Sequence, residues 1–355
     1  MWIRFNLAFA FTLAAAIGGT LLFVLLVDPL GVSPIALISD QNIVYNDRRQ
    51  AMPQIIRSRR YDSFIVGSST TITLDPAWVE SAFGGRFANV AIQGATPYEQ
   101  SRVIGLVARQ SPRMILHGLD ADWCAPGASR YHPWWPFPEW LYSDLHPYVM
   151  RRLLNWHIVR LAIGKVGLAL GLNSPLVLAN GFDTQLPRDS AWDLEKARAR
   201  LYSQGTKGAE AASKSSNASP DRSSPPRPGT FPSLDLLSET VARIPSSTTL
   251  VMLFMPVHVA VLPPPGSDPY NRLEACKGRV AEIARRPKTH VIDFMRRSVI
   301  TQDDSRFWDS LHLRAGPAKD LVERTHEAIA RGGSPGDGAY RYLAGQVQRS
   351  GAPNH

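Results

Sequence analysis

The stretch SFIVGSST at residues 63–70 is the pattern that decides the fold. Its first half is a short, mostly apolar run of the length of a buried strand, and Gly67 allows a tight turn directly after it. Asp75 and Pro76 then predict the start of a helix, because aspartate caps helix N-termini and proline fits the first helical position. A strand that turns sharply into a helix exposes its turn residues, here Ser68 and Ser69, at the carboxyl edge of a sheet.

The same alternation of strand and helix continues along the chain. Four more strands are expected, at residues 87–92, 114–116, 250–255 and 290–294. Residues 96–99 (TPYE) form a capping box with proline at the first helical position, which predicts a helix up to Arg109. A last helix is expected from Gly316 to Gly332. This order predicts an α/β fold with a mostly parallel sheet covered on both faces.

The composition is that of a folded, basic protein. The 355 residues include 39 basic and 30 acidic side chains, a net charge of +9, with 44% hydrophobic and 19% charged positions. These values exclude a disordered or collagen-like chain and leave room for one large or two small domains. A basic excess is typical of proteins that bind an anionic surface, which is either nucleic acid or membrane and envelope polymer.

The N-terminal segment favours the membrane. Between Arg4 and Asp28 no residue is charged, and the run is long enough to cross a bilayer as a helix. A cleaved signal peptide and a buried core helix are the alternatives. With Arg4 before the segment and no basic residue after it until Arg48, the positive-inside rule places the bulk of the chain outside the cytoplasm. We therefore expect a single-pass protein of the inner or cytoplasmic membrane, facing the periplasm or cell exterior, with the lipid bilayer and not nucleic acid as partner.

The chain divides into a transmembrane anchor at residues 1–27, a linker at 28–55, an α/β domain at 56–335 and a tail at 336–355. A Trp-rich insertion at 123–173 and a low-complexity loop at 203–232 interrupt the domain. The second half of the insertion is an amphipathic helix that lies either on a membrane surface or over the core as a lid. Cys124 and Cys276 permit a disulfide but do not demand one. The basic residues expected against anionic lipid or polymer are Arg48, Arg49, Arg57, Arg59, Arg60, Arg151, Arg152, Arg160 and Lys165.

Three residues form a candidate catalytic triad. Ser69 lies in the turn after the first strand, and Asp309 and His312 lie three residues apart near the last helix. That spacing lets the carboxylate meet one ring nitrogen and leaves the other free to take a proton from a serine hydroxyl. The same local patterns would arise if Ser69 were a plain helix cap and if Asp309 and His312 were a structural Asp and a surface His. The prediction therefore depends on whether the fold brings the three residues together.

These residues resemble the sequence blocks of the SGNH/GDSL hydrolase superfamily. Residues 67–70 (GSST) are similar to the first block, with Ser69 as nucleophile, and residues 89–96 (NVAIQGAT) to the second. Asp309 and His312 match the last block. The resemblance implies a three-layer sandwich around a flavodoxin-like parallel sheet. It also implies an oxyanion hole made by the backbone N–H groups of Ser69 and Gly94.

The third block departs from that family. Its members carry Gly-x-Asn-Asp, with the Asn side chain donating to the oxyanion, whereas this chain has GLDAD at residues 118–122. An ionised Asp120 can only accept hydrogen bonds, so it replaces that donor only if it is held protonated. The candidate substrate contacts are Ser68, Asn89, Asp120, Asp122 and His258. No metal-ligand spacing and no dinucleotide or phosphate-loop motif is present, so neither a metal nor a cofactor is expected.

The anchor and the Gly-Ser-Ser turn together look like the envelope acyl-transfer branch, which includes the D-alanyl transfer protein of teichoic acid modification and the alginate O-acetylation proteins. This likeness implies an O-acyltransferase or esterase that acts on an envelope polysaccharide or glycan, with a membrane-bound acyltransferase as partner. The alternative is a non-catalytic envelope protein that keeps the fold and binds a polysaccharide or a membrane partner.

Overall fold

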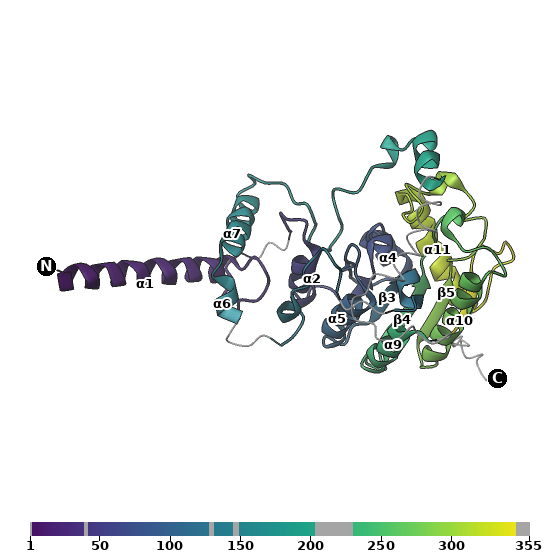
Figure 1. The fold of residues 1–355 in the computed structure, drawn as a ribbon, viewed down its shortest axis with the longest axis horizontal. Coiled ribbons are helices and arrows are strands. Elements are labelled where there is room, and N and C mark those ends of the chain that lie inside the picture. Colours follow the sequence, from purple (N-terminus) through teal and green to yellow (C-terminus); the bar gives the residue numbers. More distant parts are fainter. Residues whose placement is uncertain (1, 39–41, 128–130, 145–148, 203–229, 346–355) are drawn as a thin grey trace, which may run out of the picture.

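The computed structural model describes residues 2–38, 42–127, 131–144, 149–202 and 230–345. It is an α/β protein with a six-stranded sheet in the order β2-β1-β3-β4-β5-β6, preceded by one long N-terminal helix (Figure 1). The first five strands are parallel, and β6 pairs antiparallel with β5. The strands are β1 (Ser63–Val66), β2 (Phe87–Asn89), β3 (Met114–Leu119), β4 (Thr249–Phe254), β5 (Thr289–Asp293) and β6 (Arg341–Ala344). The helices are α1 (Trp2–Val27), α2 (Arg48–Arg57), α3 (Ser69–Ile72), α4 (Pro76–Phe83), α5 (Pro97–Ala108), α6 (Val149–Leu153), α7 (Trp156–Ala169), α9 (Pro232–Ala242), α10 (Asp268–Ile283) and α11 (Ala315–Arg331).

The sheet buries apolar side chains on both of its faces. Along β1, Phe64 and Val66 join one hydrophobic cluster, whereas Ile65, which points to the opposite face, joins another. Helices α5, α9 and α10 contribute to the first cluster, and α4 and α11 contribute to the second. Strands buried on both faces are nearly continuous hydrophobic runs, which is the pattern of parallel sheets.

The helix boundaries follow the capping signals in the sequence. The side chain of Asp75 accepts the N–H of Ala77 at the start of α4, and Thr96 and Glu99 form the expected capping box of α5. The last helix ends at Gly332, which adopts the left-handed conformation that favours glycine. The second strand is shorter than expected and ends at Asn89. The residues after it form instead the loop that carries Gly94.

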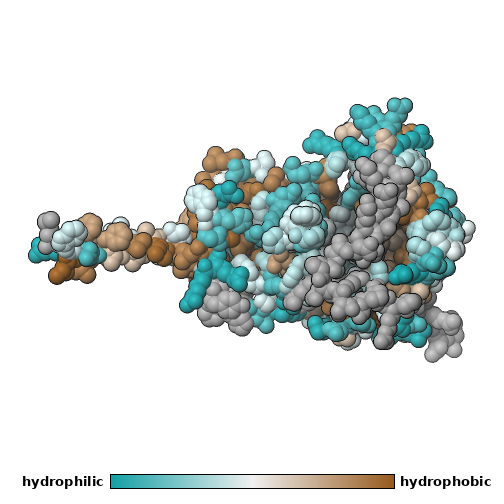
Figure 2. All heavy atoms as spheres, viewed as in Figure 1, coloured by the Kyte–Doolittle hydropathy of each residue, from teal (hydrophilic) through white to brown (hydrophobic). Residues whose placement is uncertain are grey.

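The N-terminal helix α1 projects away from the α/β domain (Figure 1). It is long and apolar enough to span a membrane, and its side chains from Trp2 to Gly19 are exposed. Among the described residues, its last two turns are the part that packs against the protein, through residues such as Val24 and Val27. Figure 2 shows hydrophobic residues covering this helix and gathering on the part of the domain next to it.

The expected linker at residues 28–55 contains most of helix α2, which is packed into the domain. Arg48 and Arg49 at its start are buried, so the expectation that they lie against lipid is wrong. Lys165 of α7 is buried too and donates to the main-chain oxygen of Asp28 at 2.7 Å. Arg59, Arg60, Arg151, Arg152 and Arg160 are exposed, as expected, and Arg57 is half-buried.

Three other segments differ from or extend the expectation. The Trp-rich insertion forms two helices, α6 and α7, after the three-residue helical turn η2 (Glu139–Leu141). Residues expected in the C-terminal tail form β6 at the edge of the sheet. Most of the low-complexity loop, residues 203–229, and the end of the tail lie outside the described residues.

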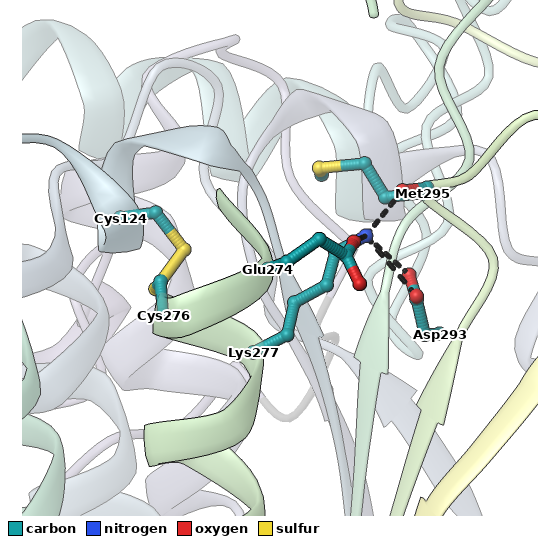
Figure 3. Close-up of a disulfide and its surroundings, with 6 residues drawn as sticks. All are labelled: Cys124, Glu274, Cys276, Lys277, Asp293 and Met295. Atoms are coloured by element: carbon teal, nitrogen blue, oxygen red, sulfur yellow. Dashed lines mark hydrogen bonds and ion pairs between the residues drawn. A yellow bond between two sulfur atoms is a disulfide. The ribbon is translucent and has the colours of Figure 1, made fainter. Parts of the chain in front are cut away.

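A disulfide joins Cys124 to Cys276 across 152 residues of sequence. Figure 3 shows Cys124, the last residue of the short helical turn η1 (Ala121–Cys124) after β3, and Cys276 on α10. The neighbouring Lys277 is buried, and its ammonium group lies 3.0 Å from the Asp293 carboxylate at the end of β5 and donates to the Met295 carbonyl. Helix α10 is therefore tied to the carboxyl ends of both β3 and β5.

Candidate active site

Ser69 lies in the turn between β1 and α3, at the carboxyl edge of the sheet. The order of the strands reverses here, because β2 lies on one side of β1 and β3 lies on the other. In α/β proteins, ligands commonly bind at such a switch point. Gly67 makes the turn tight, since a Cβ at this position would clash with the side chain of Thr71. Ser69 is half-buried, so its hydroxyl lies at the edge of the protein and not in the core.

The structure brings Ser69, His312 and Asp309 together. The Nε2 atom of His312 lies 2.9 Å from the Ser69 hydroxyl, although the two residues are 243 positions apart. The other ring nitrogen, Nδ1, lies 2.9 and 2.8 Å from the two oxygens of Asp309. A serine becomes nucleophilic when its hydroxyl contacts an imidazole that in turn contacts a carboxylate.

The Asp309 carboxylate is suited to hold the ring. Burial raises the pKa of Asp309, but the hydrogen bond and charge of His312 and the N–H groups of Leu311 and His312 outweigh burial and lower that pKa below its usual value. The carboxylate therefore stays ionised and keeps the proton on Nδ1 of His312. The free Nε2 then faces the Ser69 hydroxyl as a base.

Gly94 supplies a backbone N–H near the site. It lies in the exposed loop after β2 with φ of +58°, a conformation that favours glycine. Among the described residues, no protein acceptor takes its N–H. The N–H of Ser69 is also without an intrahelical acceptor, because Ser69 is the first residue of α3. These two donors are the candidates for an oxyanion hole.

Two buried arginines of α2 hold the Gly94 loop in place. The guanidinium of Arg48 donates to the carbonyls of Ala91 at 2.6 Å, Asn89 at 2.9 Å and Gly181 at 3.0 Å. Arg49 pairs with Glu99 at 2.7 Å and also donates to the carbonyl of Gly94 at 3.2 Å.

Neither arginine was recognised as part of the site from the sequence. A signal was present in the helical spacing of the apolar residues Ala51, Met52, Ile55 and Ile56, which predicts a helix with a buried face.

Asp120 lies at the end of β3, next to the serine turn. Its carboxyl group receives hydrogen bonds from Ser68 and Gln100, whereas its Oδ1 atom is buried with no hydrogen-bond partner among the described residues. Burial and the neighbouring charge of Asp122 raise the pKa of Asp120 to about 7. The carboxyl group is thus substantially protonated at neutral pH, which is the condition for it to donate a hydrogen bond.

Two candidate substrate contacts have structural roles instead. Asn89 is fully buried, and its side-chain amide donates to the carbonyls of Thr71 and Leu74 below the serine turn. His258 is also fully buried, and its Nε2 lies 3.0 Å from Asp304. The polar atoms of these two side chains are bonded inside the protein, and contact of either side chain with a substrate stays a prediction.

Both residues nevertheless position the site. Asn89 fixes the turn after β1, and the main-chain N–H of His258 donates to the carbonyl of Ser310, between Asp309 and His312. Ser68 is buried beside Asp120, whereas Asp122 is exposed. Of the five candidate contacts, Asp122 is thus the one that is exposed, although packing around its carboxyl group raises the pKa of Asp122 above its usual value. Asp120 has a buried polar atom without a partner among the described residues.

The Trp-rich insertion reaches the Gly94 loop. A Cβ built on Gly94 would lie 2.9 Å from Trp135 and 3.2 Å from His132. The rings of these two residues are stacked with centroids 4.1 Å apart, and the guanidinium of Arg49 lies over Trp135. The Trp135 ring is about half exposed. An aromatic surface therefore borders the candidate oxyanion donor Gly94.

No group of three or more His, Cys, Asp or Glu residues within the described part of the chain is arranged to hold a metal ion.

No family model and no curated protein matches this chain.

Proposed function

We propose that this protein is a membrane-anchored serine acyl enzyme of the cell envelope, related to the SGNH/GDSL hydrolases. The observation that carries the proposal is the Asp309–His312–Ser69 arrangement, in which both ring nitrogens of His312 lie within 3 Å of their partners. The strand order 2-1-3-4-5 is that of flavodoxin-like sheets. Together with the apolar clusters on both faces, this order supports a three-layer sandwich.

The first half-reaction forms an acyl-enzyme. The Ser69 oxygen attacks the carbonyl carbon of an ester while Nε2 of His312 takes its proton. The negative oxygen of the tetrahedral intermediate accepts hydrogen bonds from the N–H groups of Ser69 and Gly94. When the intermediate collapses, the bond to the leaving alcohol breaks, and His312 returns its proton to that alcohol.

The second half-reaction transfers the acyl group to an acceptor hydroxyl. His312 takes the proton of that hydroxyl as it attacks the acyl-enzyme, and Ser69 leaves with a proton from His312. A sugar hydroxyl as acceptor makes the protein an O-acyltransferase, and water makes it an esterase. The stacked rings of Trp135 and His132 beside Gly94 favour a sugar acceptor, because aromatic faces pack against sugar rings. Exchange of Trp135 for alanine should lower transfer to a glycan and leave acylation of Ser69 intact.

The anchor places this chemistry at a membrane. Helix α1 crosses the inner or cytoplasmic membrane, and the α/β domain lies on its periplasmic or outer side. An enzyme in that position receives its acyl group from a membrane-bound acyltransferase that moves the group across the bilayer. A polysaccharide or glycan of the envelope is the acceptor.

One observation favours a second function. The third oxyanion donor of the SGNH family is an asparagine, and Asp120 stands in its place. Loss of one such donor costs on the order of 3 kcal/mol of transition-state stabilisation. A chain that has lost its catalysis would be a binding protein for an envelope polysaccharide or a membrane partner. The alternative requires that Ser69 is not reactive.

A fluorophosphonate probe distinguishes the two functions. Such probes modify serines that are activated by a histidine, so the full chain should be labelled on Ser69. Labelling should disappear in Ser69→Ala and fall sharply in His312→Ala. Ser68→Ala is the matched control, because it removes the adjacent hydroxyl and should keep the label. A folded wild-type chain that does not react would favour the binding protein, and labelling that depends on Ser68 would reassign the nucleophile.

A further inference from the structure

Helix α7 carries apolar side chains on two opposite sides. Its inner side, which includes Ile158, Leu161 and Leu168, is buried in the hydrophobic core. Its outer side repeats at helical spacing through Trp156, Arg160, Ile163 and the C-cap residue Leu170, and we call these four residues the α7 outer face. Trp156, Ile163 and Leu170 on this face are 71%, 53% and 68% exposed. A helix that is apolar on both sides is normally covered on both sides.

The α7 outer face lies where α1 enters the protein. Helix α7 packs against α1 and runs across its C-terminal end (Figure 1). Lys165 on the buried side of α7 donates to the carbonyl of Asp28, the residue directly after α1. In Figure 2 the hydrophobic surface of α1 continues onto this part of the domain.

The length of α1 places α7 at the surface of the bilayer. Residues 2–19 of α1 are exposed along their whole length. The uncharged part of this stretch begins at Phe5 and spans about 22 Å as a helix, so a hydrocarbon core of roughly 30 Å ends within the next two turns of α1. Packing of α1 on the domain begins directly after this stretch. Because α7 crosses α1 at that level, it lies in the region of the lipid headgroups.

The charges around the α7 outer face suit an anionic leaflet. Arg151, Arg152 and Arg160 are exposed on α6 and α7, and residues 149–173 contain no Asp or Glu. Basic residues combined with exposed Trp, Ile and Leu are characteristic of helices that lie in the plane of a membrane interface.

We propose that the α7 outer face lies in the headgroup region of the leaflet from which α1 emerges and binds anionic phospholipid there. The inference rests on the membrane-anchor part of the proposed function and not on its chemistry. Two contacts with the membrane, α1 through it and α7 along it, fix the orientation of the domain, which a single helix would leave free to swing. The Ser69 site is then held at a constant height above the lipid.

The test uses the full chain reconstituted into vesicles of phosphatidylcholine with phosphatidylglycerol. An environment-sensitive fluorophore is attached to a cysteine introduced by Ile163→Cys, and both native cysteines are already joined in the disulfide. Val299→Cys is the matched control, because Ile163 and Val299 are both β-branched and are 53% and 54% exposed. Flotation of the vesicles reports separately whether α1 anchors the chain.

At position 163 the fluorophore should emit at shorter wavelength than at position 299, and headgroup-linked nitroxide lipids should quench it about twofold more strongly. Exchange of Arg151, Arg152 and Arg160 for glutamine should reduce the difference between anionic vesicles and vesicles of phosphatidylcholine alone. Water-like emission at position 163 in chains that float with the vesicles would overturn the proposal and leave the anchor and the enzyme standing. Chains that do not float would overturn the anchor and the α7 contact together, whatever the reactivity of Ser69.

Discussion

The carboxyl group of Asp120 changes charge near neutral pH, and that change acts on the residues beside it. When the carboxyl group is protonated, it is neutral and can donate one hydrogen bond. When it is ionised, it places a buried negative charge next to Ser68. A pKa raised from 3.8 to about 7 means that the folded protein holds this proton more tightly than the unfolded chain does. Ionisation of Asp120 therefore works against the fold.

Asp120→Asn should stabilise the protein in a pH-dependent way. The amide is neutral at every pH, so the variant escapes the loss of stability that the wild type incurs as pH rises from about 4 to about 7. The difference in melting temperature between variant and wild type should grow over this range and level off above it. Thermal unfolding at pH 4, 6 and 8 measures the effect, and a difference that does not vary with pH would contradict the environment described for Asp120.

Arg48 is a second residue whose effect should be large. Arg48→Ala leaves the carbonyls of Asn89, Ala91 and Gly181 buried without a donor, and we expect a loss of about 3 kcal/mol or more in the free energy of unfolding. The exposed Arg59 is the control, and Arg59→Ala should change that free energy by less than about 0.5 kcal/mol. Denaturant unfolding compares the two variants. Equal, small effects would show that Arg48 does not hold the Gly94 loop.

Sequence patterns identify some of these residues and not others, for a physical reason. Asp309 and His312 are predictable as a pair because three residues of spacing bring their side chains together locally. Arg48 is not predictable as a clamp, because its partners are main-chain carbonyls 41 to 133 residues away. Every residue carries a carbonyl, so nothing in the sequence marks those three.

At the scale of elements, the disulfide connects the loop that carries Asp120 to helix α10. Replacement of both Cys124 and Cys276 by serine should lower the free energy of unfolding by about 2–5 kcal/mol, because the bond closes a loop across 152 residues. Reduction of the wild type should lower its melting temperature to about that of the serine variant. The serine variant is the control, because a reductant should not change its melting temperature. A wild type whose melting temperature is insensitive to reduction would contradict the disulfide.

The elements that sequence analysis found are those with local signals. Caps mark the starts of α4 and α5, and apolar runs mark the first five strands. Helix α2 was missed because its first two residues are arginines, which local patterns assign to the surface, and because it contains Pro53. Strand β6 was missed because its four residues are half-buried and, within the described part of the chain, pair with β5 alone.

At the scale of the whole molecule, the site exists only because distant parts of the chain meet. Ser69 follows β1, Gly94 follows β2, and His312 precedes the last helix, and the parallel sheet brings all three to one edge. Helix α2 and the Trp-rich insertion pack onto the same edge, and both lie between α1 and the sheet (Figure 1). The basic side chains thus include arginines that are buried beside the site, Arg48 and Arg49, and arginines that are exposed on α6 and α7, where we propose a contact with the membrane.

The most direct test of this account is whether Ser69 carries an acyl group during turnover. Full-length protein mixed with p-nitrophenyl acetate should release a burst of about one equivalent of p-nitrophenol per chain. Intact-mass and peptide analysis should then find one acetyl group on the peptide that contains Ser69, in the wild type and in Ser68→Ala but not in Ser69→Ala. A folded wild-type chain that gives no burst and no adduct, or one acetylated at another residue, would contradict the claim that Ser69 is the nucleophile.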